Sequence, residues 1–167
     1  MMRYFVSFGS NLGRREETIR AALDMLSAHA DVKTFRVSSV IETEPWGHAD
    51  QPAFLNGVAI FESERAPIEV LNILLEIEKR FGRERKIKWG PRTLDLDIVL
   101  VTDGSGDIVR YADERLEIPH PHFRERLFVL EPLAELCPNI SYMGTSIRDD
   151  IEALKLSARR EETGEAT

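Results

Sequence analysis

Residues 88–101 read Lys-Trp-Gly-Pro-Arg-Thr-Leu-Asp-Leu-Asp-Ile-Val-Leu-Val, and this stretch joins a basic loop to a strand. From Leu94 onward, apolar and acidic residues alternate and then give way to a continuous apolar run, which is typical of a strand entering a core. Alternate side chains of a strand point to the same face, so Asp95 and Asp97 share one face with Cα atoms about 7 Å apart. Two anions on one face repel each other. The pair favours a bound cation; the alternative is an exposed sheet face with two solvated acids.

The loop before this strand is strongly basic. Residues 83–92 carry five basic residues against one acid, a net charge of +4. Arginine binds phosphate oxygens in bidentate fashion and lysine binds them as a point charge, whereas the alternative is a solvated loop. The Trp89-Gly90-Pro91 interruption favours binding, because an indole and a rigid turn are an odd choice for solubility alone. Mg²⁺ prefers carboxylate and phosphate oxygens, so the stretch predicts Mg²⁺ at the aspartates and a polyphosphate at the loop. The basic residues are Arg83, Arg85, Lys86, Lys88 and Arg92.

The composition describes one globular domain. The chain has 167 residues and a net charge of −7, which leaves −11 outside the basic loop and argues against a broad nucleic-acid interface. Cys137 is the single cysteine, so an intrachain disulfide and a cysteine-cluster zinc site are both excluded. No signal-peptide pattern and no run of about 20 apolar residues is present. We therefore expect a cytoplasmic protein that does not bind membranes.

The predicted elements alternate in a characteristic order. Their pattern gives strand, helix, strand, strand, helix, strand, which is the ferredoxin-like βαββαβ arrangement of the α+β class, with an antiparallel sheet and both helices packed on one face. The segments are a strand at 4–8, a helix around 19–26, strands at 32–42 and 54–61, a helix from Pro67 to about Gly82, and the strand from Leu94.

Two of these elements carry more specific expectations. Asn56-Gly57 inside a strand predicts a bulge or a close backbone approach. In the second helix, the spacing predicts one stripe made of Ile68, Leu71, Leu75 and Glu78.

The C-terminal third is less regular. A hairpin turn at 103–107 and a short returning strand at 108–111 lead to an irregular segment, 118–122, because two prolines exclude helix and inner strand there. Short helices are expected at 123–136 and 146–156. We expect residues 1–156 to form one domain, followed by a frayed tail at 157–167.

Two further groups of side chains suit the binding of a nucleotide and of a flat ring. Arg115, His120 and Arg126 surround the proline-rich turn and can add donors to a phosphate, although a lone histidine is more often structural. Trp46, Phe54 and Phe128 can stack on a heterocycle, and Asn56 offers a donor and an acceptor to a ring edge. The alternative for these aromatic residues is a place in the core.

Six motifs, in one order along the chain, resemble those of the 6-hydroxymethyl-7,8-dihydropterin pyrophosphokinase family. The resemblance extends from about Tyr4 to Pro138, and its most specific part is the Trp89–Asp97 run. The motifs are Gly-Ser-Asn-Leu-Gly at 9–13, Thr-Glu-Pro-Trp-Gly at 43–47, Gln-Pro-Ala-Phe-Leu-Asn at 51–56, Gly-Arg-Glu-Arg at 82–85, Trp-Gly-Pro-Arg-Thr-Leu-Asp-Leu-Asp at 89–97 and Ile-Pro-His-Pro at 118–121.

This resemblance implies a monomeric, ferredoxin-like kinase that moves pyrophosphate from ATP to the hydroxymethyl group of the pterin and releases AMP. It implies that Asp95 and Asp97 bind two Mg²⁺ ions and act with Arg83 and Arg92 in catalysis. The ATP-binding residues it implies, which include the three donors around the proline-rich turn, are Arg83, Lys88, Trp89, Arg92, Arg115, His120 and Arg126. The pterin-binding residues it implies are Thr43, Glu44, Trp46, Phe54, Asn56 and Phe128, with the ring between the two phenylalanines.

Two rival functions remain testable. A nucleic-acid binder would use the basic loop on phosphates and an aromatic residue on bases, but it has no use for the paired aspartates. A phosphohydrolase would keep the metal ions and would release inorganic phosphate without any need for pterin.

Overall fold

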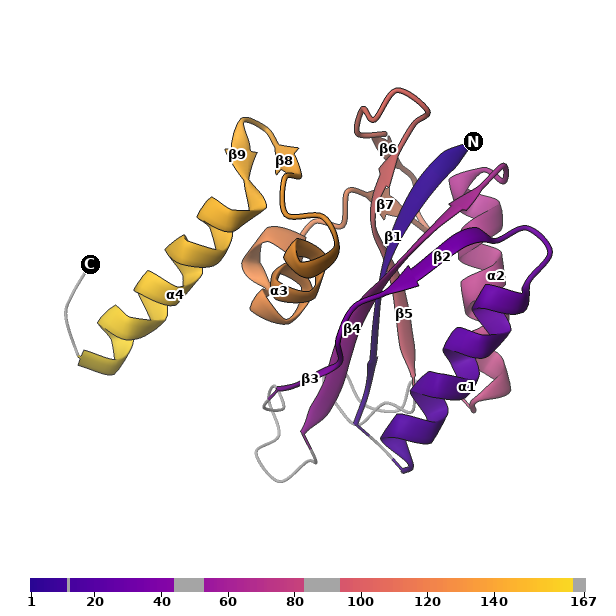
Figure 1. Ribbon diagram of the computed structural model, residues 1–167, viewed down its shortest axis with the longest axis horizontal. Coiled ribbons are helices and arrows are strands. Elements are labelled where there is room, and N and C mark those ends of the chain that lie inside the picture. Colours follow the sequence, from indigo (N-terminus) through magenta and orange to yellow (C-terminus); the bar gives the residue numbers. More distant parts are fainter. Residues whose placement is uncertain (12, 44–52, 83–93, 164–167) are drawn as a thin grey trace.

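The computed structural model describes residues 1–11, 13–43, 53–82 and 94–163 of the chain. These residues form an antiparallel sheet that has helices on both faces (Figure 1). None of the helices in these ranges combines the length and the apolar character needed to cross a membrane. In chain order, the elements are β1 (Met2–Ser10), α1 (Arg15–Ala28), β2 (Lys33–Val37), β3 (Ile41–Thr43), β4 (Phe54–Ser63), α2 (Pro67–Arg80), β5 (Asp95–Thr102), β6 (Tyr111–Ala112), β7 (Glu117–Ile118), the 3₁₀ helix η1 (Phe123–Glu125), α3 (Leu127–Leu136), β8 (Ser141–Tyr142), β9 (Thr145–Ser146) and α4 (Ile147–Thr163).

The main sheet has the strand order β2, β4, β1, β5, and β3 pairs with β4 beyond the end of β2. Every pairing is antiparallel, so the predicted antiparallel sheet of an α and β fold is confirmed. β1 lies between β4 and β5. Gly9, the second-last residue of β1, is the register partner of Asn56 on β4 and of Asp95 on β5. Three segments that are far apart in the sequence therefore meet at one end of the sheet.

Two hydrophobic cores cover the two faces. β4 is buried along most of its length, as expected for a strand covered on both sides. α1 and α2 share one face, as predicted, and α3 lies on the opposite face, which the sequence prediction left unassigned (Figure 1). The first core includes Tyr4, Val6, Phe8, Leu26, Leu74 and Leu96. The second core includes Phe5, Val58, Leu100, Leu130, Leu133 and Ile147.

The predicted strand at 32–42 is two strands rather than one. β2 and β3 both pair with β4, and Ser38 lies in the break between them. The Ser38 backbone N–H donates to the carbonyl of Val58, and the Val58 N–H donates to the Ser38 side-chain oxygen, both at 2.9 Å. A hydroxyl thus replaces a carbonyl as acceptor, and the strand direction can change without leaving a buried N–H unpaired.

Gly57 is closely approached, but by a side chain, and the register of β4 with β1 continues through it without a bulge. A Cβ atom on this residue would lie 2.3 Å from Cζ of Phe8, so the aromatic ring occupies the space of the missing side chain.

The predicted stripe of α2 is partly wrong. The buried side chains are Val70, Leu74, Ile77 and Glu78, whereas Leu75 is 36% exposed. Val70, Leu74 and Ile77 are separated by four and three residues, so they lie on one face of the helix and pack against the sheet. Leu75 lies on the flank of that face.

The C-terminal third also differs in detail. Ile108 forms a single bridge to Thr102, and the short strand pair is β6 with β7 instead of a strand at 108–111. α4 continues through Thr163, so residues 157–163 are helical where the sequence predicted a frayed tail. Strong helix formers in this stretch extend the helix without burying its side chains.

Candidate active site

The two aspartates lie at the start of β5 on the face that α3 also covers. Asp97 is the register partner of Ser7, and its side chain is exposed; Asp95 is half-buried. Leu94, Leu96 and Ile98 point into the opposite core. The predicted sharing of one face by the two acids is therefore confirmed.

The donor set fits Mg²⁺. Carboxylate oxygens at an accessible strand end are the ligands this ion prefers, usually completed by water and substrate phosphates. In the ranges that the structure describes, no cluster of three or more acids, histidines or cysteines can hold a metal ion. Any ion at Asp95 and Asp97 therefore needs oxygens other than those of the described acids.

Thr43, Phe54 and Asn56 are brought together by the pairing of β3 with β4. Thr43 is the register partner of Phe54, and the Asn56 Nδ2 group donates to the Thr43 hydroxyl at 2.6 Å. A Cβ on Gly9 would lie 2.7 Å from Asn56 Oδ1, so the glycine makes room for this amide. Since Gly9 also pairs with Asp95, the Cα atoms of Asn56 and Asp95 are about 10 Å apart, or two strand spacings.

Phe128 and Arg126 come from the start of α3, which lies against β3 and β4. Phe128 is half-buried at the margin of the second core. The Arg126 guanidinium carbon is 5.8 Å from the centre of the Phe128 ring, a cation–π distance. A positive charge and an aromatic face thus lie side by side on this surface.

His120 lies close enough to Asp97 and Arg126 for its ionisation to respond to both. Its backbone N–H donates to the Val99 carbonyl at 2.9 Å, which ties the turn to β5. Its Nδ1 accepts from the backbone N–H of His122 at 3.1 Å, so the neutral ring carries its proton on Nε2. Burial lowers the pKa of His120, the Asp97 carboxylate opposes that shift, and Arg126 adds to it. A neutral imidazole with a donating Nε2 results.

The side chain of Arg115 contacts α2, and among the described residues it forms no hydrogen bond or ion pair with those of the site given above. Its Nη2 donates to Asn72 Oδ1 of α2 at 2.6 Å, and its side chain is exposed. The remaining predicted site residues lie outside the described residues. They are Glu44, Trp46, Arg83, Lys88, Trp89 and Arg92, together with Arg85 and Lys86 of the basic loop.

Three polar residues near the strand ends were not identified from the sequence. Glu78 of α2 is 1% exposed, and its Oε2 accepts from the Leu96 backbone N–H at 2.8 Å, between the two aspartates. An acid on an otherwise apolar helix stripe is a signal that points to it. Ser7 becomes apparent only through its register with Asp97. The Ser10 hydroxyl is buried and has no hydrogen-bond partner among the described residues.

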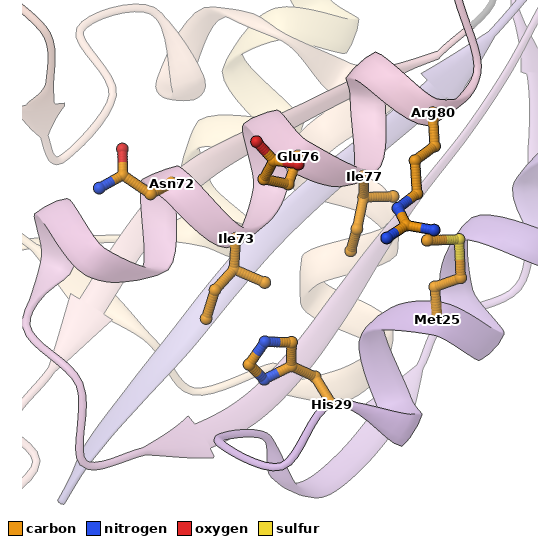
Figure 2. Close-up of a pocket in the computed structure, with 7 residues that line it drawn as sticks. All are labelled: Met25, His29, Asn72, Ile73, Glu76, Ile77 and Arg80. Carbon is orange, nitrogen blue, oxygen red and sulfur yellow. The ribbon is translucent and has the colours of Figure 1, made fainter.

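A separate groove lies between α1 and α2 (Figure 2). It has a volume of about 380 Å³, and its lining includes Met25 of α1, His29 directly after α1, and Ile73 and Arg80 of α2. It contains none of the predicted site residues. This groove is therefore separate from the candidate site at the strand ends.

The comparisons with known proteins agree on one family. Residues 5–138 match the family model described as 7,8-dihydro-6-hydroxymethylpterin-pyrophosphokinase (HPPK). The chain is 41% identical over 152 residues to a 2-amino-4-hydroxy-6-hydroxymethyldihydropteridine pyrophosphokinase of Bacillus subtilis (strain 168), covering 91% of this chain and 88% of the relative. It is 43% identical over 140 residues to the protein of the same name from Pseudomonas aeruginosa (strain PAO1), covering 84% and 83%.

A solved structure supports the fold. A crystal structure of HPPK-DHPS in complex with substrates superposes with a TM-score of 0.69 at 14% identity. The match covers 96% of this chain and 44% of that longer one, so the present chain spans less than half of it.

Proposed function

The chain belongs to the 7,8-dihydro-6-hydroxymethylpterin-pyrophosphokinase family, and we propose that it binds both substrates of the family reaction at the ends of β3, β4, β1 and β5. That reaction transfers pyrophosphate from ATP to 6-hydroxymethyl-7,8-dihydropterin, giving the pterin diphosphate and AMP in folate biosynthesis. The observation that carries the proposal is the position of Gly9 between Asn56 and Asp95. Because of it, the proposed pterin-binding and metal-binding side chains lie close enough for the two bound substrates to meet.

We assign the pterin to the β3–β4 side. The Asn56 amide, held by Thr43 and fitted against Gly9, has a fixed orientation toward a ring edge that carries both donors and acceptors. Phe54 and Phe128 supply aromatic faces for the ring. Glu44 and Trp46 complete the proposed pocket. A ring held here would direct its hydroxymethyl group along the strand ends toward the aspartates.

We assign the polyphosphate to the β5 side. Asp95 and Asp97 are proposed to hold two Mg²⁺ ions, which when bound neutralise phosphate charge in the transfer. His120 lies near both Asp97 and Arg126, so Arg126 and the Nε2 donor of neutral His120 are proposed to bind phosphate oxygens. Arg83, Lys88, Trp89, Arg92 and Arg115 complete the proposed ATP site, and Arg83 and Arg92 act on the leaving AMP. No side chain is assigned as a general base, since positioning and charge neutralisation account for most of the catalysis in this class of reaction.

The ferredoxin-like topology of the chain is part of the same proposal. The strand order β2, β4, β1, β5 with two helices on one face fits the ferredoxin-like βαββαβ pattern. A single functional domain over residues 1–156, a cytoplasmic location, a monomeric state and the lack of a nucleic-acid partner remain predictions.

The experiment mixes the protein with ATP, Mg²⁺ and 6-hydroxymethyl-7,8-dihydropterin and measures AMP. We expect AMP only when the pterin is present, and no AMP when EDTA has removed Mg²⁺. Inorganic phosphate released without pterin would indicate a phosphohydrolase. Tight, salt-sensitive binding of RNA without ATP would favour the nucleic-acid binder.

A further inference from the structure

Arg15 occupies an unusual position for a cation. It is the first residue of α1, and the N-terminus of a helix carries a partial positive charge that favours acids. Glu16 and Glu17 in the same turn follow that rule, whereas Arg15 does not. A helix terminus with an unfavourable charge suggests that the side chain makes contacts elsewhere that offset the cost.

Those contacts reach across to the sheet. Arg15 Nη1 donates to the Ala53 carbonyl at 2.6 Å and lies 3.6 Å from Glu42 Oε1. The Arg15 side chain is 23% exposed and the Glu42 side chain 62%, so the hydrogen bond to Ala53 is partly shielded from water and the ion pair is largely open to it. The adjacent Arg14 is different. Its side chain is 83% exposed and pairs with Glu17 within the same helix.

The two partners of Arg15 flank the proposed pterin residues. Glu42 immediately precedes Thr43 on β3, and Ala53 immediately precedes Phe54 on β4. Thr43 and Phe54 are register partners, so one guanidinium holds both chain segments next to this pair. Figure 1 shows the start of α1 and these strand ends at the same end of the sheet.

Arg15 holds these strands from the face opposite the site. Glu42 is the register partner of Leu55, which belongs to the core beneath α1 and α2, whereas Thr43 and Asn56 face the aspartate side. The guanidinium therefore contacts β3 and the residue before β4 from the sheet face opposite the binding residues. It does not itself line the proposed pocket.

We infer that Arg15 is a positioning residue for the pterin: by holding Glu42 and Ala53 it fixes Thr43, Phe54 and the Asn56–Thr43 hydrogen bond in their binding geometry. This inference rests on the proposed function, because it assumes that those residues bind the pterin. It concerns substrate affinity at one end of the site, so ATP binding at β5 is expected to be independent of it.

The test compares Arg15→Ala with Arg14→Ala, a matched control one residue away. We expect Arg15→Ala to raise the KM for pterin about tenfold, because the variant loses a charge-assisted hydrogen bond to a backbone carbonyl and, with a smaller effect, an exposed ion pair. The KM for ATP should stay within about twofold, and Arg14→Ala should match wild type in both constants. The dissociation constant of the pterin, measured by calorimetry with a non-hydrolysable ATP analogue present, should rise in parallel.

Two milder variants keep the test decisive if Arg15→Ala folds poorly. Glu42→Gln removes the ion pair and leaves the Ala53 hydrogen bond, and Arg15→Lys keeps the charge with a single donor group. Each should raise the pterin KM by a smaller factor than Arg15→Ala.

The outcomes separate this inference from the proposed function. If the wild-type protein forms no AMP with pterin, the proposed function fails. If the wild-type protein is active and the Arg15 and Glu42 variants keep its pterin KM, the inference is overturned. Equal increases in both KM values together with a lower Tm would make Arg15 merely structural and would also overturn it.

Discussion

Asp97 is exposed at a strand position whose neighbours on the same face are Asp95 and the small residue Ser7. Nothing in the packing of either core depends on its carboxylate. We expect Asp97→Ala to lower pterin-dependent AMP formation by about a thousandfold or more, because a metal ligand contributes several kcal/mol to the transition state. The Tm should hold or rise slightly as the repulsion with Asp95 is relieved.

The matched control for that substitution is Asp107→Ala, an exposed aspartate in the turn after β5. It should leave both activity and Tm unchanged. Near-normal AMP formation by folded Asp97→Ala would mean that the carboxylate pair is a solvated surface feature.

Between elements, the contact of α2 with β5 depends on Glu78. Its carboxylate accepts the Leu96 N–H, and no other strand follows β5 at this edge of the described sheet. We expect Glu78→Ala to lower the free energy of unfolding by about 1–3 kcal/mol in urea titrations, because a buried N–H loses its acceptor. Glu78→Gln keeps an acceptor oxygen and should cost less, so equal losses from both variants would argue against this role.

The contact of β1 with β4 depends on Gly57. Adding a Cβ places it 2.3 Å from the Phe8 ring inside the first core, so Gly57→Ala should lower the free energy of unfolding by about 1–3 kcal/mol through overpacking. Gly104→Ala is the control, since its Cβ would meet nothing nearer than 3.9 Å. A Gly57→Ala protein as stable as this control would show that the ring moves aside freely.

At this scale, alternation was the most informative signal in the sequence. It placed Asp95 and Asp97 on one face correctly, because a period of two leaves no other choice. The break at Ser38 was not predictable, since it depends on a hydroxyl that replaces a carbonyl across two strands. The stripe of α2 was misjudged at Leu75, because residues at helical spacing can lie on the flank of a buried face. The closeness of Asn56 to Asp95 required the register, which no local pattern contains.

For the whole molecule, the second face of the sheet depends on the C-terminal third of the chain. Ile147 is fully buried there, and Ile140, Tyr142, Ile151 and Leu154 pack around the same core. These residues lie beyond residue 138, where the family match ends. The family model therefore stops before the segment that completes this core, although the alignment with the Bacillus subtilis relative spans 152 residues.

Two truncations test that dependence. A chain that ends at residue 156 should keep the Tm and activity of the full chain, because the side chains described after it are exposed. A chain that ends at residue 138 should be much less stable, since loss of Ile147 alone removes about 2 kcal/mol of apolar burial. Thermal unfolding of both proteins distinguishes these outcomes, and equal Tm values would show that α4 is dispensable.

Gly9 has a consequence for inhibitor design. A compound that reaches from Asn56 to Asp95 must pass over Gly9, where a single added carbon would lie 2.7 Å from the Asn56 amide oxygen. A substitution of Gly9 that blocked such a compound would also displace the Asn56 amide, which we propose binds the pterin. A substitution of Gly9 is therefore not expected to give resistance to an inhibitor that spans Asn56 and Asp95 while keeping the enzyme active.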